Sequence, residues 1–134
     1  MTNEELKAQQ IVKTNKELLL KDLCARLPYN PIVEYKGENY NVLGVVHGRL
    51  VLCKSFMSHT LDECPLITEV KPYLFPLESM TEEQEAEYND LNCYELGLFP
   101  HTEAALDYLI KHHFDYRGLI DTDLANDATG LNIY

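Results

Sequence analysis

The sequence predicts an α+β protein: a small antiparallel β-sheet or an SH3-like barrel, preceded by one helix and followed by two. Three observations support this. Apolar residues recur at helical spacing near the start, apolar and polar residues alternate between residues 31 and 54, and helix-start signals follow residue 80. The 134 residues suffice for one domain with a real core, so we expect a single α+β domain over residues 1–134.

The first helix is expected over residues 3–27, where Pro28 stops it, and an interruption near Thr14 is compatible with the sequence. Four apolar residues with i, i+3, i+4, i+7 spacing form one stripe: Leu20, Leu23, Cys24 and Leu27. This spacing predicts that Cys24 lies in the core and that Arg26 lies off the stripe.

A three-stranded meander is expected over residues 32–36, 39–46 and 49–54. Gly37 with Glu38 suits a two-residue type II′ turn, and His47 with Gly48 marks the second turn.

The segment after residue 70 is predicted to be an edge strand or an extended connector. Pro72 and Pro76 lack the backbone donor that a central strand requires. Tyr73, Phe75 and Leu77 alternate, which places them on one face.

Two helices are predicted to follow, over residues 81–94 and 102–113. Thr81 with Gln84 has the spacing of a capping box, and Thr102 is an N-cap residue. Beyond them, we expect the apolar residues of the tail to pack on the core. These are Phe114, Leu119, Ile120 and Leu124.

The net charge of −11 is concentrated at the C-terminal end. Residues 81–134 contain two basic and twelve acidic residues. Since nucleic-acid binding depends on Lys and Arg, this third argues against direct contact with nucleic acid. It is either a solvated helical face or, alternatively, an acidic DNA mimic that inhibits a nucleic-acid-binding host protein. The mimic requires the carboxylates of the predicted helix Glu82–Glu95 and those of Glu103, Asp107 and Asp115 on one surface.

No stretch approaches the roughly 18 apolar residues that a membrane helix needs, so we expect no membrane interaction. The polar start does not resemble a signal peptide, which predicts a cytoplasmic protein. Four cysteines, with no Cys-x-x-Cys pair, are expected to be free thiols.

The densest set of functional side chains lies after the last predicted helix. We interpret it as a candidate binding surface that consists of His112, His113, Asp115, Tyr116 and Arg117. A carboxylate beside histidines also suits general-base chemistry, so a small hydrolase or metal-dependent enzyme that uses His112, His113 and Asp115 is an alternative. No nucleophile accompanies them in the sequence, and we assign no catalytic residue.

Cys53, His59 and Cys64 offer three zinc ligands, with His47 or Cys93 as a fourth. Their spacing does not match a zinc motif, and a buried thiol with a loop histidine accounts for the same residues. We therefore expect no metal and no cofactor.

Four segments together resemble a family of short proteins found in gut anaerobes, their prophages and mobile elements. The segments are Leu18-Leu-Leu-Lys-Asp-Leu-Cys-Ala-Arg-Leu-Pro-Tyr29, Lys71-Pro-Tyr-Leu-Phe-Pro-Leu-Glu-Ser-Met-Thr-Glu-Glu83, His112-His-Phe-Asp-Tyr-Arg-Gly-Leu-Ile120 and Asp127-Ala-Thr-Gly-Leu-Asn-Ile-Tyr134. The resemblance implies an intracellular, phage-linked setting, and it implies no activity or catalytic residue.

The leading hypothesis is a non-enzymatic protein-interaction module with a protein partner. The sequence is also compatible with a homo-oligomer.

Overall fold

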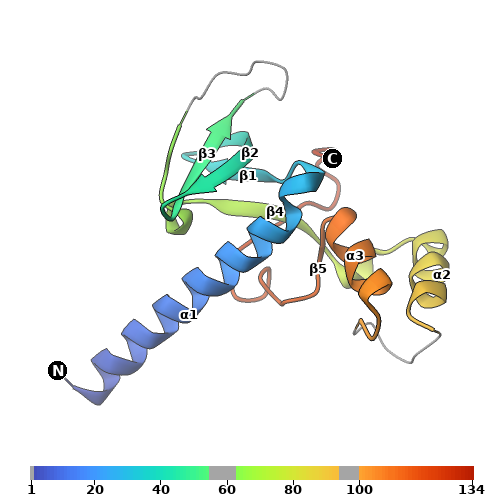
Figure 1. Ribbon diagram of the computed structural model, residues 1–134, viewed down its shortest axis with the longest axis horizontal. Coiled ribbons are helices and arrows are strands. Elements are labelled where there is room, and N and C mark those ends of the chain that lie inside the picture. The colour runs from blue at the N-terminus through green and yellow to red at the C-terminus, as the bar shows by residue number, and fades with distance from the viewer. Residues whose placement is uncertain (1, 55–62, 94–99) are drawn as a thin grey trace. The chain divides into compact units, whose positions relative to one another are not determined.

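The computed structural model describes residues 2–54, 63–93 and 100–134, and it confirms the α+β class (Figure 1). The chain divides into two compact units, Met1–Pro72 and Tyr73–Tyr134. The elements in chain order are α1 (Asn3–Arg26), β1 (Ile32–Tyr35), β2 (Glu38–Val46), β3 (Arg49–Cys53), β4 (Lys71–Pro76), α2 (Glu82–Leu91), α3 (Glu103–Lys111), β5 (Phe114–Asp115) and β6 (Asn126–Asp127), with short 3-10 turns at Leu27–Tyr29, Ile67–Glu69 and Leu77–Ser79. No helix among the described residues is long and apolar enough to span a membrane.

α1 is one uninterrupted helix. It begins at a capping box, in which Thr2 and Glu5 bond each other's backbone amides at 3.1 and 3.2 Å. Every described side chain of residues 3–14 is exposed, and Figure 1 shows this blue half of the helix extending beyond the strands of the first unit. Burial begins with Leu19 and Leu23, so only the second half of α1 contributes to the core.

The predicted stripe of α1 is wrong at two positions. Cys24 is exposed, whereas Arg26 is completely buried. The Arg26 guanidinium forms two hydrogen bonds with the Asp22 carboxylate, at 2.9 and 3.2 Å, and Asp22 is also buried. An i, i+4 ion pair of this kind neutralises both charges, which allows a face with charged residues to lie inside.

The meander of the first unit is antiparallel, as predicted. β1 pairs β2 and β2 pairs β3, while β1 also pairs antiparallel with Lys71 and Pro72 of β4. His47 and Gly48 form the second turn, but the first turn consists of Lys36 and Gly37 rather than the predicted Gly37 and Glu38. Lys36 and Gly37 both have positive φ, 52° and 79°, as type I′ turns require, so the type II′ prediction is wrong.

The sheet is open, and it is not the alternative SH3-like barrel. In the first unit the strand order is β3-β2-β1-β4, and no ladder joins β3 to β4 among the described residues. Two isolated bridges, Arg49 to Leu66 and Leu52 to Glu63, extend the outer side of β3.

The prediction of an edge strand or an extended connector after residue 70 is wrong, because β4 has neighbouring strands on both sides. Its first two residues pair with β1, and Tyr73–Pro76 pair in parallel with β5 and β6 in the second unit. The neighbours Tyr73 and Leu74 point to opposite faces and are only 7% and 1% exposed, so both faces of this strand are covered. Each pairing is two residues long, which lets the prolines sit in a strand with neighbours on both sides.

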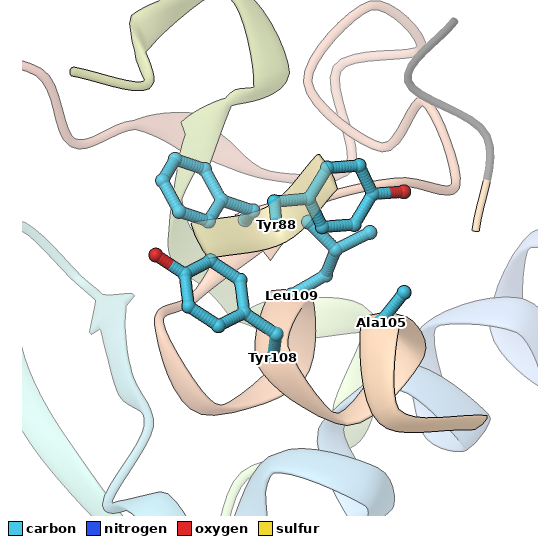
Figure 2. Packing of buried hydrophobic residues seen from close by; sticks show 5 residues of the cluster. Tyr88, Ala105, Tyr108 and Leu109 are labelled. Atoms are coloured by element: carbon cyan, nitrogen blue, oxygen red, sulfur yellow. The ribbon is translucent and has the colours of Figure 1, made fainter. Parts of the chain in front are cut away.

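The second unit is built around α2 and α3. Thr81 and Gln84 form the predicted capping box, and Thr102 caps α3 by accepting from the amide of Ala105 at 3.0 Å. Both helices end two or three residues earlier than predicted, and residue 94 lies outside the described part of the chain. Their core cluster comprises Tyr88, Ala105, Tyr108, Leu109 and Phe114 (Figure 2).

The tail of the second unit packs partly as predicted. Phe114 and Leu119 are buried, while Ile120 and Leu124 are half-buried.

Candidate functional site

The predicted segment 112–117 begins where α3 ends. α3 runs to Lys111, His112 is its C-cap, and His113 adopts φ +62° in the left-handed region. A left-handed residue just after the C-cap commonly terminates a helix. The two histidines therefore leave the helix in different directions and have different environments.

His112 is half-buried and packs on the ring of Tyr108, with centroids 4.4 Å apart. Burial lowers the pKa of His112 below its usual 6.5, and the neighbouring ammonium of Lys111 lowers it further, while the Glu87 carboxylate opposes this shift without reversing it. The imidazole is consequently neutral at pH 7.

His113 is buried, and its ring stacks on Tyr134 with centroids 3.7 Å apart and an interplanar angle of 13°. Its carbonyl accepts a hydrogen bond of 2.8 Å from the amide of Phe75. The Tyr134 hydroxyl donates to the Tyr73 carbonyl at 3.0 Å, so the tail is held against β4 beside the histidine.

The Asp115 carboxylate stabilises the backbone that follows β5. The carboxylate is buried and accepts from the amides of Leu119 and Ile120 at 3.0 and 2.9 Å. It forms no hydrogen bond with either histidine among the described residues, so the geometry does not form a histidine–carboxylate dyad. Tyr116 and Arg117 are half-buried, and the Arg117 guanidinium lies 4.7 Å from the Tyr116 ring centre.

A cavity of about 320 Å³, which we name the His112 cavity, opens beside the two histidines. Residues from β4, α2, the end of α3 and the tail line it. They are Phe75, Ser79, Gln84, Lys111, His112, His113, Phe114, Thr129, Gly130 and Tyr134. The structure thus places His112 and His113 in one cavity and leaves Asp115, Tyr116 and Arg117 outside it.

The His112 cavity is distinguished by its charge. The unit Tyr73–Tyr134 contains thirteen acidic residues, the twelve after residue 80 plus Glu78, and only Lys111 and Arg117 are basic. None of the acidic residues within the described part of this unit lines the cavity, whereas Lys111 does. An uneven distribution of this kind determines which ligands the cavity accepts.

A second cavity of about 360 Å³ in the same unit has the opposite character. Asp115 and Tyr116 line it together with three further carboxylate residues, Glu78, Asp121 and Asp127. The predicted binding surface is therefore divided, because the two histidines line one cavity, Asp115 and Tyr116 line the other, and Arg117 lines neither.

The zinc alternative gains no support from the described residues, in which no group of three or more His, Cys, Asp or Glu is arranged to hold a metal ion. Cys53 is buried, while Cys64 and Cys93 are exposed, and none of the three forms a disulfide within the described part of the chain. His59 lies outside the described residues, as does most of the predicted loop 55–65.

The acidic-mimic alternative required Asp115 on the same surface as the helical carboxylates. Asp115 is instead buried, while Glu82, Glu83, Glu85, Glu87 and Asp90 on α2 are exposed. Glu87 also accepts from the Tyr108 hydroxyl at 3.0 Å. Burial, with a further contribution from this hydrogen bond, raises the pKa of Tyr108 to about 12. Glu95 lies outside the described residues.

Sequence reasoning missed most of the cavity wall. Ser79, Gln84, Thr129 and Tyr134 are far from His112 in the chain, and only tertiary packing brings them to the cavity. Lys111 could have been identified from the sequence as a site residue, since it is the only lysine after residue 71 and is adjacent to the two histidines.

No protein-family model matches the chain, and neither the curated proteins nor the solved structures include a significant match.

Proposed function

We propose that the protein is a non-enzymatic protein-interaction module that engages its partner at the His112 cavity. The observation that carries this proposal is the cavity itself. It combines both predicted histidines with Lys111, and no carboxylate among the described residues of this acidic unit lines it. Concave sites with an apolar lining and a few convergent polar groups are the usual form of binding sites in proteins.

The rim of the cavity supports a macromolecular partner. Tyr134 lines the cavity and is 42% exposed, and Leu131, next to the lining residue Gly130, is 53% exposed. Tyrosine is enriched in protein interfaces because it offers a large apolar surface with a polar tip. A partner residue inserted into the cavity would bury these side chains at its edge.

Binding is favoured over general-base catalysis by the position of Asp115. Both of its oxygens accept from backbone amides, and it lies on the second cavity rather than beside the histidines. The carboxylate therefore supports a loop in this structure. The resemblance to short phage and mobile-element proteins suggests a host protein as the partner.

A second candidate is an acidic mimic that uses α2. The five exposed carboxylates of this helix favour it, since they form a high density of negative charge on one short element. A basic, nucleic-acid-binding host protein is the partner that this alternative predicts.

Site-specific photo-crosslinking tests both candidates. p-Benzoylphenylalanine is introduced in place of exposed Thr129 at the cavity, exposed Ala86 on α2, or exposed Lys21 on α1 as the background control. After irradiation in nuclease-treated host lysate, cross-linked proteins are identified by mass spectrometry.

The cavity proposal predicts one discrete protein adduct at position 129 that is absent at positions 86 and 21. An adduct with a basic protein at position 86 alone would favour the acidic mimic. Identical patterns at all three positions would contradict both.

A further inference from the structure

We propose that the His112 cavity binds a carboxylate group, with Lys111 as its counter-ion. This inference rests on the proposed function only in taking the cavity as the binding surface. It names the chemistry of the group that enters.

Lys111 has no competing partner. It is exposed, and it forms no ion pair within the described residues, although its unit contains thirteen acidic residues. Because none of the described carboxylates lines the cavity, an incoming anion meets the ammonium without displacing one of them. Glu87 of α2 is not part of the lining but does act on His112, whose pKa it raises against the larger effect of burial; its carboxylate already accepts a hydrogen bond from the Tyr108 hydroxyl.

Gln84 adds a hydrogen-bond donor. Its Oε1 accepts from the amide of Thr81 at 2.9 Å as part of the capping box, which fixes the side chain and leaves its NH2 group for a ligand. The Ser79 hydroxyl, in contrast, donates to the Pro76 carbonyl at 2.6 Å and is left as an acceptor. The polar wall therefore offers donors from Lys111 and Gln84.

The remaining wall is aromatic. Phe75 lies between Phe114 and Tyr134, with ring centroids 6.1 and 5.9 Å away. An apolar or aromatic body attached to the carboxylate would pack on these rings, and their position next to Lys111 orients the ligand.

The balance of charge favours a monoanion over a dianion. Lys111 is the only Lys or Arg in the lining, and His112 is neutral at pH 7 because burial and Lys111 both lower its pKa. One positive charge neutralises a carboxylate, whereas a phosphate dianion would retain an uncompensated charge in a partly enclosed site.

Calorimetric titration with small probes tests the chemistry. Phenylacetate is the ligand, phenylacetamide is its neutral isostere, and phenyl phosphate is the dianion. Lys111→Met removes the proposed counter-ion, and Arg117→Gln is the matched control, because it removes the only other basic residue of the unit from outside the cavity. Thermal unfolding followed by circular dichroism verifies that each variant is folded.

The inference predicts that phenylacetate binds at least tenfold more tightly than phenylacetamide and phenyl phosphate. It also predicts that Lys111→Met weakens phenylacetate binding about tenfold, as the loss of a charged hydrogen bond implies, while Arg117→Gln changes it less than twofold. Equal losses in the two variants, equal binding of acid and amide, or no binding of phenylacetate would each overturn it.

A second titration, with a short peptide, identifies the source of the carboxylate. Acetyl-Ala-Phe is titrated with a free C-terminal carboxylate and as its amide. Binding of the acid peptide, but not the amide, with the same loss in Lys111→Met supports a carboxylate supplied by a partner protein. If phenylacetate binds but the acid peptide does not, the carboxylate site is supported and the proposal of a protein partner at this cavity is overturned. The two proposals can therefore fail separately.

Discussion

The ring of His113 stacks on the ring of Tyr134 at a centroid distance of 3.7 Å, and this contact joins the end of α3 to the tail. It forms one wall of the His112 cavity. We predict a coupling free energy of about 0.5–1.5 kcal/mol between the two side chains in a double-mutant cycle of His113→Gly and Tyr134→Leu, the range found for aromatic pairs. Urea unfolding followed by circular dichroism provides the four free energies, and additive effects would show that the contact contributes no stability.

The backbone at His113 gives a separate prediction. At φ +62°, a side chain with a β-carbon is strained, and glycine is not. We therefore expect the free energy of unfolding of His113→Ala to be about 1 kcal/mol lower than that of His113→Gly. In an ordinary helix position the order is the reverse, because alanine favours the helix more than glycine does. The reverse order in urea unfolding would mean that the residue is not left-handed in solution.

The buried pair Asp22 and Arg26 is expected to be the most sensitive polar contact in the first unit. Arg26→Met leaves a buried carboxylate without this partner and should lower the free energy of unfolding by about 3–5 kcal/mol. The double variant Asp22→Leu with Arg26→Met should recover most of this loss, because neither charge is then buried alone.

Lys21→Met on the exposed face of the same helix serves as the control and should change the free energy of unfolding by less than about 0.5 kcal/mol. Equal effects of Lys21→Met and Arg26→Met would contradict the buried position of Arg26.

The pH dependence of stability should include a contribution from His112. Its folded-state pKa lies below the unfolded value of 6.5, so the unfolded chain binds more protons in the window between the two. The free energy of unfolding should therefore fall as the pH is lowered through this window.

Replacing His112 with glutamine should remove that part of the slope, while His101→Gln at an exposed position should retain it. Urea midpoints measured between pH 5 and 7.5 test the prediction, and parallel curves for the wild type and His112→Gln would contradict it.

Asp115 is predicted to act on stability through the loop after β5. Asp115→Ala leaves the amides of Leu119 and Ile120 without their acceptor and should cost about 1–3 kcal/mol. Asp115→Asn keeps one acceptor oxygen and should cost less. The exposed Asp121→Ala is the control for charge, and a loss of equal size there would refute the structural role.

Local sequence signals predicted the elements well. The caps at Thr81 and Thr102 and the turn at His47 depend on neighbours within a few residues, and their interactions form as expected. The same signals misplaced Arg26, because its burial depends on neutralisation by Asp22 rather than on the apolar stripe.

Longer-range features were not predictable from the sequence. The two prolines indicated an edge at β4, yet three short pairings cover it on both sides. The candidate site shows the same limit, since Gln84 and Tyr134 reach the histidines only through tertiary packing.

The most direct test of the proposed carboxylate site is an NMR titration of the 15N-labelled protein with phenylacetate. If the His112 cavity is a carboxylate site, the largest amide shifts will occur at the lining positions of α2, the end of α3 and the tail, and they will disappear in Lys111→Met but persist in Arg117→Gln. Shifts that spread over both units, or that persist unchanged in Lys111→Met, would contradict the account.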